Sequence, residues 1–220
     1  MKRGPKHVRC PSGELSGGRL DGAHSAAGFS LIELLAVAAI LLLLCALYWG
    51  PALGGNRQRQ AQKDCQTHLQ KIYVALAIYA NDHAGRFPEL AGARMSEEAL
   101  DGLVPRYTVD RAVFTCPGSG DRLLPAGESL RGHRISYAYC MGRQAADSQQ
   151  VVMSDEQVNT RAKAAGEYAF SSTGRPPGNN HGKLGGNFLF CDGHTDATPP
   201  CVPFPLALTN GVVWLNPKPR

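Results

Sequence analysis

The chain has 220 residues, of which 43% are hydrophobic and 19% are charged, and its formal net charge is +5 at pH 7. Residues 1–28 hold much of that excess, because residues 29–220 carry 18 basic and 16 acidic side chains. So small a surplus gives no electrostatic support for nucleic-acid binding, and we expect no nucleic-acid partner. The roughly 140 residues after Ala80 suffice for one modest hydrophobic core.

A long apolar segment covers residues 29–50. From Phe29 to Trp49 it contains 21 residues without Pro or Gly. As a helix rising about 1.5 Å per residue it would cross a hydrocarbon core of roughly 30 Å, so we expect a transmembrane helix here. Glu33 is the exception in this segment. Its charge would cost about 2.5 to 3.5 kcal/mol at the centre of a bilayer, so the carboxylate either reaches the headgroups or has a partner.

The junction before this segment resembles the cleavage and methylation signature of type IV prepilins and type II secretion pseudopilins. Gly28 is followed by Phe29, and Glu33 comes four residues later at the start of the apolar stretch. The resemblance implies that a prepilin peptidase cuts after Gly28 and methylates the amino group of Phe29. It further implies that Glu33 pairs with the N-terminal ammonium of a neighbouring subunit in a filament.

The resemblance also implies how the chain is divided and where it lies. We expect a cleaved leader (1–28), a transmembrane helix (29–50), a hinge with the periplasmic half of the helix (51–80) and a periplasmic head (81–220). The protein would be a single-pass inner-membrane protein, whose partners are copies of itself or related subunits, the peptidase, an assembly platform and membrane lipid. The flanking charges do not settle the orientation, so it is taken from the resemblance. A plain single-span anchor is the competing interpretation.

A second helix is predicted over residues 56–80, which contain neither Gly nor Pro. Apolar side chains recur there at spacings of three and four, which is typical of one buried helical face. This face consists of Cys65, Leu69, Ile72, Leu76 and Tyr79. The helix, with the Asn-Asp, Gly and Phe-Pro that follow in residues 81–90, resembles the G-like proteins of type II secretion.

Short β-branched or aromatic runs between turn residues follow, and they predict an antiparallel sheet. The runs are residues 113–116, 135–141, 150–154, 187–191 and 212–215. Asp192-Gly193 predicts a type I′ hairpin, because glycine tolerates the positive φ of that turn. Together the elements predict an α+β, pilin-like fold in which a long N-terminal helix packs on a small β-sheet head. The last residues, 215–220, are predicted to form a flexible tail.

The span of residues 181–194 resembles the C-terminal motif of this family, a His followed by Asp-Gly, although ten residues rather than nine intervene between His181 and Asp192. His181, Asp192 and His194 are chemically suited to bind zinc, or calcium with the help of carbonyl oxygens, with Asp155, Glu156 and Asp196 as further candidates. The alternative is a capped hairpin without metal. The resemblance favours calcium as the ion, in a fold-supporting role.

Seven cysteines are present, and export to the periplasm would allow disulfides. Cys116 with Cys140, or Cys191 with Cys201, are reasonable pairs, but the sequence does not give the connectivity. Buried free thiols are the alternative for some of them.

Two classes of function follow. The first is a structural pilin or pseudopilin subunit without a catalytic step of its own, assembled through its N-terminal helix for type II protein secretion. The second is a membrane-anchored periplasmic metal-dependent hydrolase that would use His181, Asp192 and His194. The sequence does not separate type II secretion from type IV pili or DNA-uptake filaments.

Overall fold

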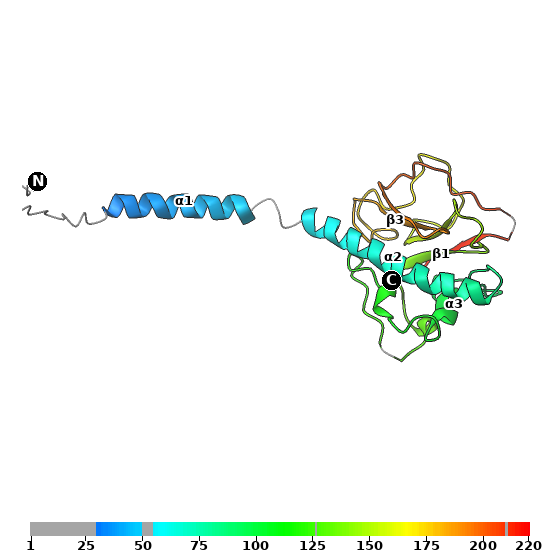
Figure 1. Cartoon of the computed structure of the whole chain (residues 1–220). Coiled ribbons are helices and arrows are strands. Elements are labelled where there is room, and N and C mark those ends of the chain that lie inside the picture. The colour runs from blue at the N-terminus through cyan, green and yellow to red at the C-terminus, as the bar shows by residue number, and fades with distance from the viewer. Residues whose placement is uncertain (1–29, 50–54, 126, 210) are drawn as a thin grey trace, which may run out of the picture. The chain divides into compact units, whose positions relative to one another are not determined.

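The computed structural model describes residues 30–49, 55–125, 127–209 and 211–220. The chain divides into two compact units, Met1–Leu47 and Tyr48–Arg220. Helix α1 (Leu31–Trp49) belongs to the first unit up to Leu47, and the second unit contains helix α2 (Gly55–Asp82) and a five-stranded sheet (Figure 1). The predicted leader and cleavage position, Gly28 and Phe29, lie outside the described residues.

Helix α1 confirms the predicted helix within residues 29–50. Its large apolar side chains are exposed along its whole described length, from Leu31 to Leu47. Glu33 lies in the first turn, where its carboxylate accepts the backbone N–H of Ser30 at 3.0 Å. Among the described helices, none is both long enough and apolar enough to cross a membrane. The membrane crossing therefore stays a prediction.

Helix α2 confirms the predicted second helix and extends it slightly at both ends. Cys65, Leu69, Ile72 and Leu76 are fully buried, as the spacing predicts. The helix ends where Gly85, with φ of 81°, donates its backbone N–H to the carbonyl oxygen of Ala80 at 2.8 Å. Glycine suits this position because it adopts the left-handed conformation at little cost.

The sheet is antiparallel throughout and has the order β4-β3-β2-β1-β5. Its strands are β1 (Tyr137–Met141), β2 (Val151–Asp155), β3 (Gly186–Phe190), β4 (Thr195–Thr198) and β5 (Val213–Leu215). Four of the five predicted runs are therefore confirmed as strands. A short helix, α3 (Ser96–Leu100), and three 3₁₀ turns, Asp101–Leu103, Ala112–Phe114 and Leu130–Gly132, complete the head.

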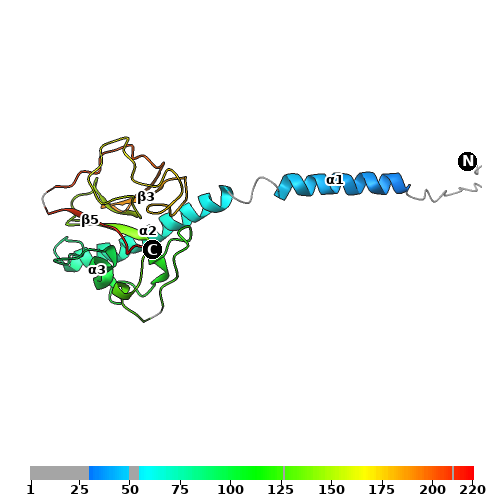
Figure 2. The same cartoon turned by 180° about the vertical axis from the view of Figure 1, so that it is seen from behind.

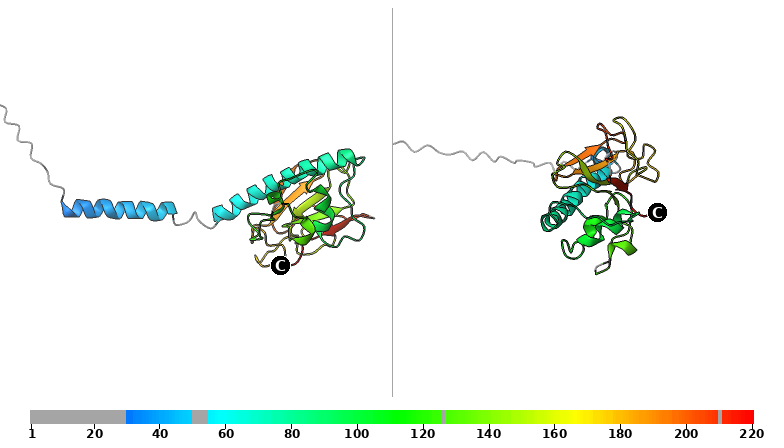
Figure 3. Two further views of the ribbon diagram at one scale, coloured as in Figure 1. Left: turned by 90° about the horizontal axis from the view of Figure 1, so that it is seen from below. Right: turned by 90° about the vertical axis from the view of Figure 1, so that its right-hand side faces the viewer.

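Each face of the sheet has its own hydrophobic cluster. On one face Tyr139 and Leu189 belong to the cluster that includes the buried side of α2, which lies along the strands (Figure 3). On the other face Phe188 and Trp214 pack with Phe170 from the long connection between β2 and β3. Alternate strand residues thus point into different layers, which explains why the strands read as nearly continuous apolar runs.

The expected strand at residues 113–116 is wrong. Ala112–Phe114 is a 3₁₀ turn, and the carboxylate of Asp110 accepts the backbone N–H of Ala112 at 3.2 Å. The run is buried all the same, with Phe114 fully covered. A short apolar run has no period that separates a buried turn from a strand, so the pattern predicted burial correctly and conformation incorrectly.

The expected flexible tail at residues 215–220 is also wrong. The carbonyl oxygen of Asn216 accepts the backbone N–H of Ser96 at 3.1 Å, and the N–H of Lys218 donates to buried Glu97 at 2.9 Å. Arg220 then donates to Asp121 at 3.1 Å. The C-terminus is therefore bound to the head, where Figure 2 marks it with a C.

Candidate functional site

The predicted hairpin joins β3 to β4, but its turn differs from the prediction. The Gly193 N–H donates to the Phe190 carbonyl oxygen at 3.0 Å, and the Phe190 N–H donates to that of His194 at 3.0 Å. Gly193 has φ of 94°, whereas among the described non-glycine residues only Ala84 has a positive φ. A type I′ turn needs positive φ at both central residues, so the loop is a three-residue turn with Gly193 in its last position.

Asp192 and His194 face each other on this exposed hairpin. The Asp192 carboxylate accepts the backbone N–H of His194 at 3.1 Å and also contacts its ring nitrogen Nδ1. These hydrogen bonds lower the pKa of Asp192, and the one from the His194 backbone N–H has the largest effect. The His194 ring stacks on Phe190 with centroids 4.0 Å apart. Asp192 therefore supports its own turn, as the capped-hairpin alternative predicts, whereas the pairing with the His194 ring was not part of that alternative.

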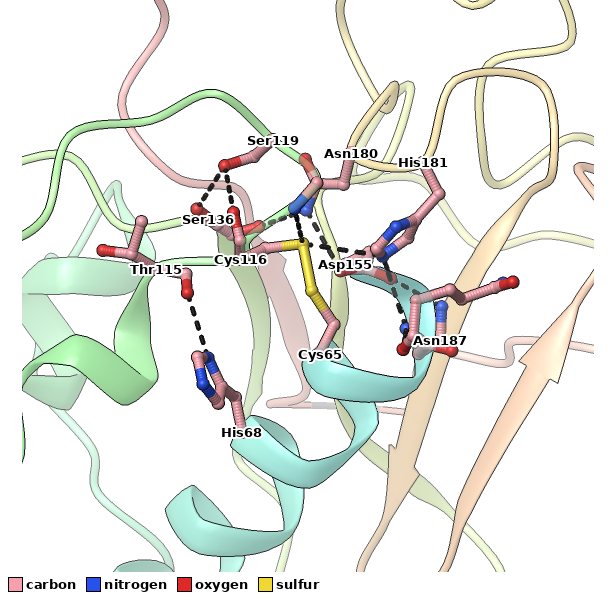
Figure 4. The surroundings of a disulfide bond; sticks show 12 residues. Cys65, His68, Thr115, Cys116, Ser119, Ser136, Asp155, Asn180, His181 and Asn187 are labelled. Atoms are coloured by element: carbon pink, nitrogen blue, oxygen red, sulfur yellow. Dashed lines mark hydrogen bonds and ion pairs between the residues drawn. A yellow bond between two sulfur atoms is a disulfide. The ribbon is translucent and has the colours of Figure 1, made fainter. Parts of the chain in front are cut away.

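His181 lies elsewhere, in the interior of the head. Its side chain is fully buried, and Nε2 lies 3.2 Å from Asp155 Oδ2 and 3.5 Å from Cys116 Sγ (Figure 4). Its other ring nitrogen, Nδ1, has no hydrogen-bond partner within the described part of the chain. Gly118 leaves room for this ring, because a Cβ there would lie 2.7 Å from Nδ1.

Asp155, at the end of β2, is the centre of a buried polar network. It accepts the backbone N–H of Asn187 at 2.7 Å and the side-chain amide of Asn180 at 3.0 Å. The Asn187 amide in turn donates to the carbonyl oxygen of Gln62 on α2 at 3.1 Å. Buried carboxylates need such donors, so this network both fixes Asp155 and joins the sheet to the helix.

The disulfide of the structure joins Cys65 on α2 to Cys116, which are 51 residues apart. The predicted pairs of Cys116 with Cys140 and of Cys191 with Cys201 are therefore wrong. Among the described cysteines, the free ones are Cys45, Cys140, Cys191 and Cys201. The alternative of buried free thiols holds for Cys140 and Cys191, whose pKa values burial raises to about 11 and about 12. Such thiols are poor nucleophiles.

The three predicted metal ligands do not meet in one site. Within the described ranges, one group of at least three potential ligands has donor atoms within 4.8 Å of one another, and it consists of Cys65, Cys116, Asp155 and His181. Asp192 and His194 are not in it. Glu156, a further candidate, pairs instead with Arg134 at 3.0 Å. A calcium site on the hairpin therefore stays a prediction that rests on resemblance.

Sequence reasoning missed the roles of Cys65, Asn180 and Asn187. One signal was available for Asn187, because it is a polar residue that opens an otherwise apolar strand run, and such a residue is usually hydrogen-bonded when buried. Cys65 was placed correctly on the buried face of α2, but its partner is distant in sequence. Nothing local indicates that pairing.

The comparisons with known proteins concern the N-terminal segment. Residues 24–48 match the family model described as the prokaryotic N-terminal methylation motif. Among curated proteins and among solved structures, none matches this chain. The motif supports a prepilin-type N-terminus, and the helix with its small antiparallel sheet is an α+β, pilin-like fold. Taken together they support a pilin-like chain of the kind that prepilin peptidase processes, with a membrane-anchored N-terminus.

Proposed function

We propose that this chain is a structural pilin or pseudopilin subunit that is cleaved after Gly28, methylated on Phe29 and assembled through its N-terminal helix into an inner-membrane-based periplasmic filament. The methylation motif at residues 24–48 carries the proposal. The role in type II protein secretion rests on the resemblance of α2 and residues 81–90 to G-like proteins of that system. The subunit would have no catalytic step of its own.

The surface of α1 supports assembly through this helix. Leu31 and Ile32 are 74% and 73% exposed, and most large apolar side chains along the helix are at least half exposed. Soluble monomers rarely leave so much contiguous apolar surface uncovered, so α1 needs a lipid environment, neighbouring helices or both. Between packed apolar helices the Glu33 carboxylate needs a counter-charge, which the freed ammonium of Phe29 in an adjacent copy would supply.

The hydrolase alternative loses its main support. It required His181, Asp192 and His194 to act at one metal, but His181 is buried beside Asp155 whereas the other two pair on the exposed hairpin. A hydrolytic metal needs an open coordination position with access to substrate. We therefore favour the structural role.

The intact mass of the membrane-extracted protein tests the proposal. When the full chain is produced with a prepilin peptidase, we expect loss of residues 1–28 and addition of one methyl group. Gly28→Leu should retain the leader, whereas the control Gly22→Leu, a substitution inside the leader, should be processed normally. A wild-type chain that keeps its leader in the presence of active peptidase would overturn the proposal.

A second experiment addresses the secretion role. Deletion of the gene from its native cell should trap secreted proteins in the periplasm while surface pili persist, and the wild-type gene should restore export. Loss of surface pili with unchanged export would assign the subunit to a pilus instead.

A further inference from the structure

We propose that Cys65, Cys116, Asp155 and His181 form a binding site for one Zn²⁺ ion when the Cys65–Cys116 disulfide is reduced. The ligand atoms of these four residues all lie within 4.8 Å of one another. Two thiolates, one imidazole and one carboxylate are ligands that zinc accepts, and four protein ligands are typical of a closed structural site. This inference is independent of the proposed assembly function.

Two of the ligand spacings match those of a tetrahedral ion, and the two sulfurs, which are bonded to each other in the disulfide, would separate on reduction. Zinc bonds of about 2.0 to 2.3 Å place nitrogen and sulfur ligands roughly 3.5 Å apart, and nitrogen and oxygen ligands roughly 3.3 Å apart, along the edges of a tetrahedron. His181 Nε2 lies 3.5 Å from Cys116 Sγ and 3.2 Å from Asp155 Oδ2. These two edges are therefore present before any ion binds.

The residues around the ligands are arranged to hold them in place. Asp155 is fixed by the N–H of Asn187 and the amide of Asn180, which leaves its carboxylate orientation set. The backbone N–H of Gly118 points to Cys116 Sγ at 3.4 Å, a hydrogen bond that would stabilise a thiolate. Hydrogen bonds of this kind from outside the coordination sphere orient ligands and raise metal affinity.

Burial makes the site closed to water. Cys65 and Asp155 are fully buried, and Cys116 and His181 are 1% exposed. His181 Nδ1 also has no partner in the described structure, so Nε2 is the ring atom that the surroundings engage. Nε2 faces the Asp155 carboxylate and the Cys116 sulfur and also lies 3.4 Å from the side-chain amide nitrogen of Asn187, which a bound cation would replace as its partner.

The redox step balances with a dithiol as the reductant. The dithiol gives two electrons and two protons to the Cys65–Cys116 bond, and it leaves as its own disulfide while two cysteine thiols form. Zinc then displaces the two thiol protons. The ion would link α2 to the segments that contain Cys116, Asp155 and His181. The disulfide and its polar neighbours join the same segments in the oxidised protein.

Cobalt titration of the full chain in detergent tests the proposal, because tetrahedral Co²⁺ bound to thiolates absorbs strongly in the visible and near-ultraviolet. After reduction without oxygen, we expect one Co²⁺ per chain, displaced by one Zn²⁺. The unreduced protein should give no thiolate-to-cobalt band. His181→Asn should weaken binding by at least about tenfold, and Cys65→Ser with Cys116→Ser should abolish it.

Controls separate this site from the other thiols. Cys45→Ser with Cys201→Ser should bind cobalt as the wild type does. If the ligand variants fail to fold, alkylation of the reduced wild type decides instead, since zinc should slow modification of Cys65 and Cys116 but not of Cys201. Absence of the thiolate-to-cobalt band in the reduced wild type would overturn the site. So would alkylation of Cys65 and Cys116 at the same rate with and without zinc.

Discussion

The ring of Tyr73 on α2 lies against the backbone of Gly193 in the β3–β4 hairpin. A Cβ atom at residue 193 would be only 2.4 Å from Cε1 of that ring, and the Tyr73 hydroxyl donates to the Cys191 carbonyl oxygen at 3.2 Å. The Asp-Gly sequence therefore serves to seat the hairpin on the helix. The Asp192-Gly193 pair thus has a packing role that does not depend on metal binding or catalysis.

Gly193→Ala should destabilise the head by about 2 to 4 kcal/mol. The added methyl group meets the Tyr73 ring, and φ of 94° is strained for any residue with a Cβ. Urea unfolding of the full chain followed by circular dichroism measures this loss. Gly102→Ala, where nothing lies within 4 Å of the new atom, should change the free energy of unfolding by less than about 0.5 kcal/mol. Equal effects of the two substitutions would contradict the packing role.

Replacing both Cys65 and Cys116 by Ser should lower the free energy of unfolding by about 4 kcal/mol. A disulfide that closes a loop of this length restricts the unfolded chain by roughly that amount, according to loop-closure entropy. The urea midpoints of the oxidised wild type and the double variant give the difference.

A peptide map without reductant checks the connectivity behind that prediction. It should link the peptide of Cys65 to that of Cys116, and Cys201→Ser should leave the link intact. A linked peptide containing Cys140 or Cys191 would show that the bond is assigned to the wrong partners.

Asp121 should make the head sensitive to acid. Burial alone would raise its pKa, but hydrogen bonds from Ser136 and Arg220 and the charge of Arg134 outweigh burial and lower it. A carboxylate with a lowered pKa in the folded state contributes stability that is complete above its ordinary pKa of 3.8 and is lost as the pH falls through the folded value.

Asp121→Asn should therefore unfold more readily than the wild type at pH 6 and should lose less further stability between about pH 5 and pH 2. Thermal melts across this range provide the measurement. Asp196→Asn, which alters an exposed carboxylate on β4, serves as the control and should follow the wild type. Parallel pH profiles for wild type and Asp121→Asn would rule out this origin of the acid sensitivity.

Glu33→Leu should reduce filament assembly by at least about tenfold while the head keeps its melting temperature. The substitution removes the charge proposed to pair with a neighbouring N-terminus, and each 1.4 kcal/mol lost is about tenfold in association. Cross-linking in native membranes counts multimers. Asp196→Asn, on the head surface, should assemble normally. Undiminished multimers of Glu33→Leu would mean that the helix needs only its apolar surface.

Local patterns were enough to predict the two helices and most of the sheet. The spacing of three and four places Cys65, Leu69, Ile72 and Leu76 on one side of α2, which predicts that this side is buried. All four residues are fully buried. The hairpin was found from Asp192-Gly193, but its turn type was not, because the same dipeptide suits a three-residue loop when the second residue alone has positive φ.

The buried site could not be predicted in the same way, because it joins residues from distant parts of the chain. Cys65 and Cys116 are 51 residues apart in the sequence. His181 lies in the connection between β2 and β3 and contacts Asp155 at the end of β2. The sequence indicates His181 and Asp155 as candidate metal ligands and Cys116 as a candidate for a disulfide. It does not indicate the role of Cys65, and it groups His181 mainly with its near neighbours in the chain. The strand order instead brings His181 next to Asp155 and Cys116.

From Arg57 onward along α2, Cys65 is the first fully buried residue. Tension applied through the N-terminal segment would load the hydrogen bond at Gln62 and then the covalent bond at Cys65 before it reached the fully buried side chains of α2. Residues beyond this point, including Leu69 and Ile72, would be shielded from that load. A subunit dragged or pushed by its helix could thus transmit force without peeling the helix away from the domain.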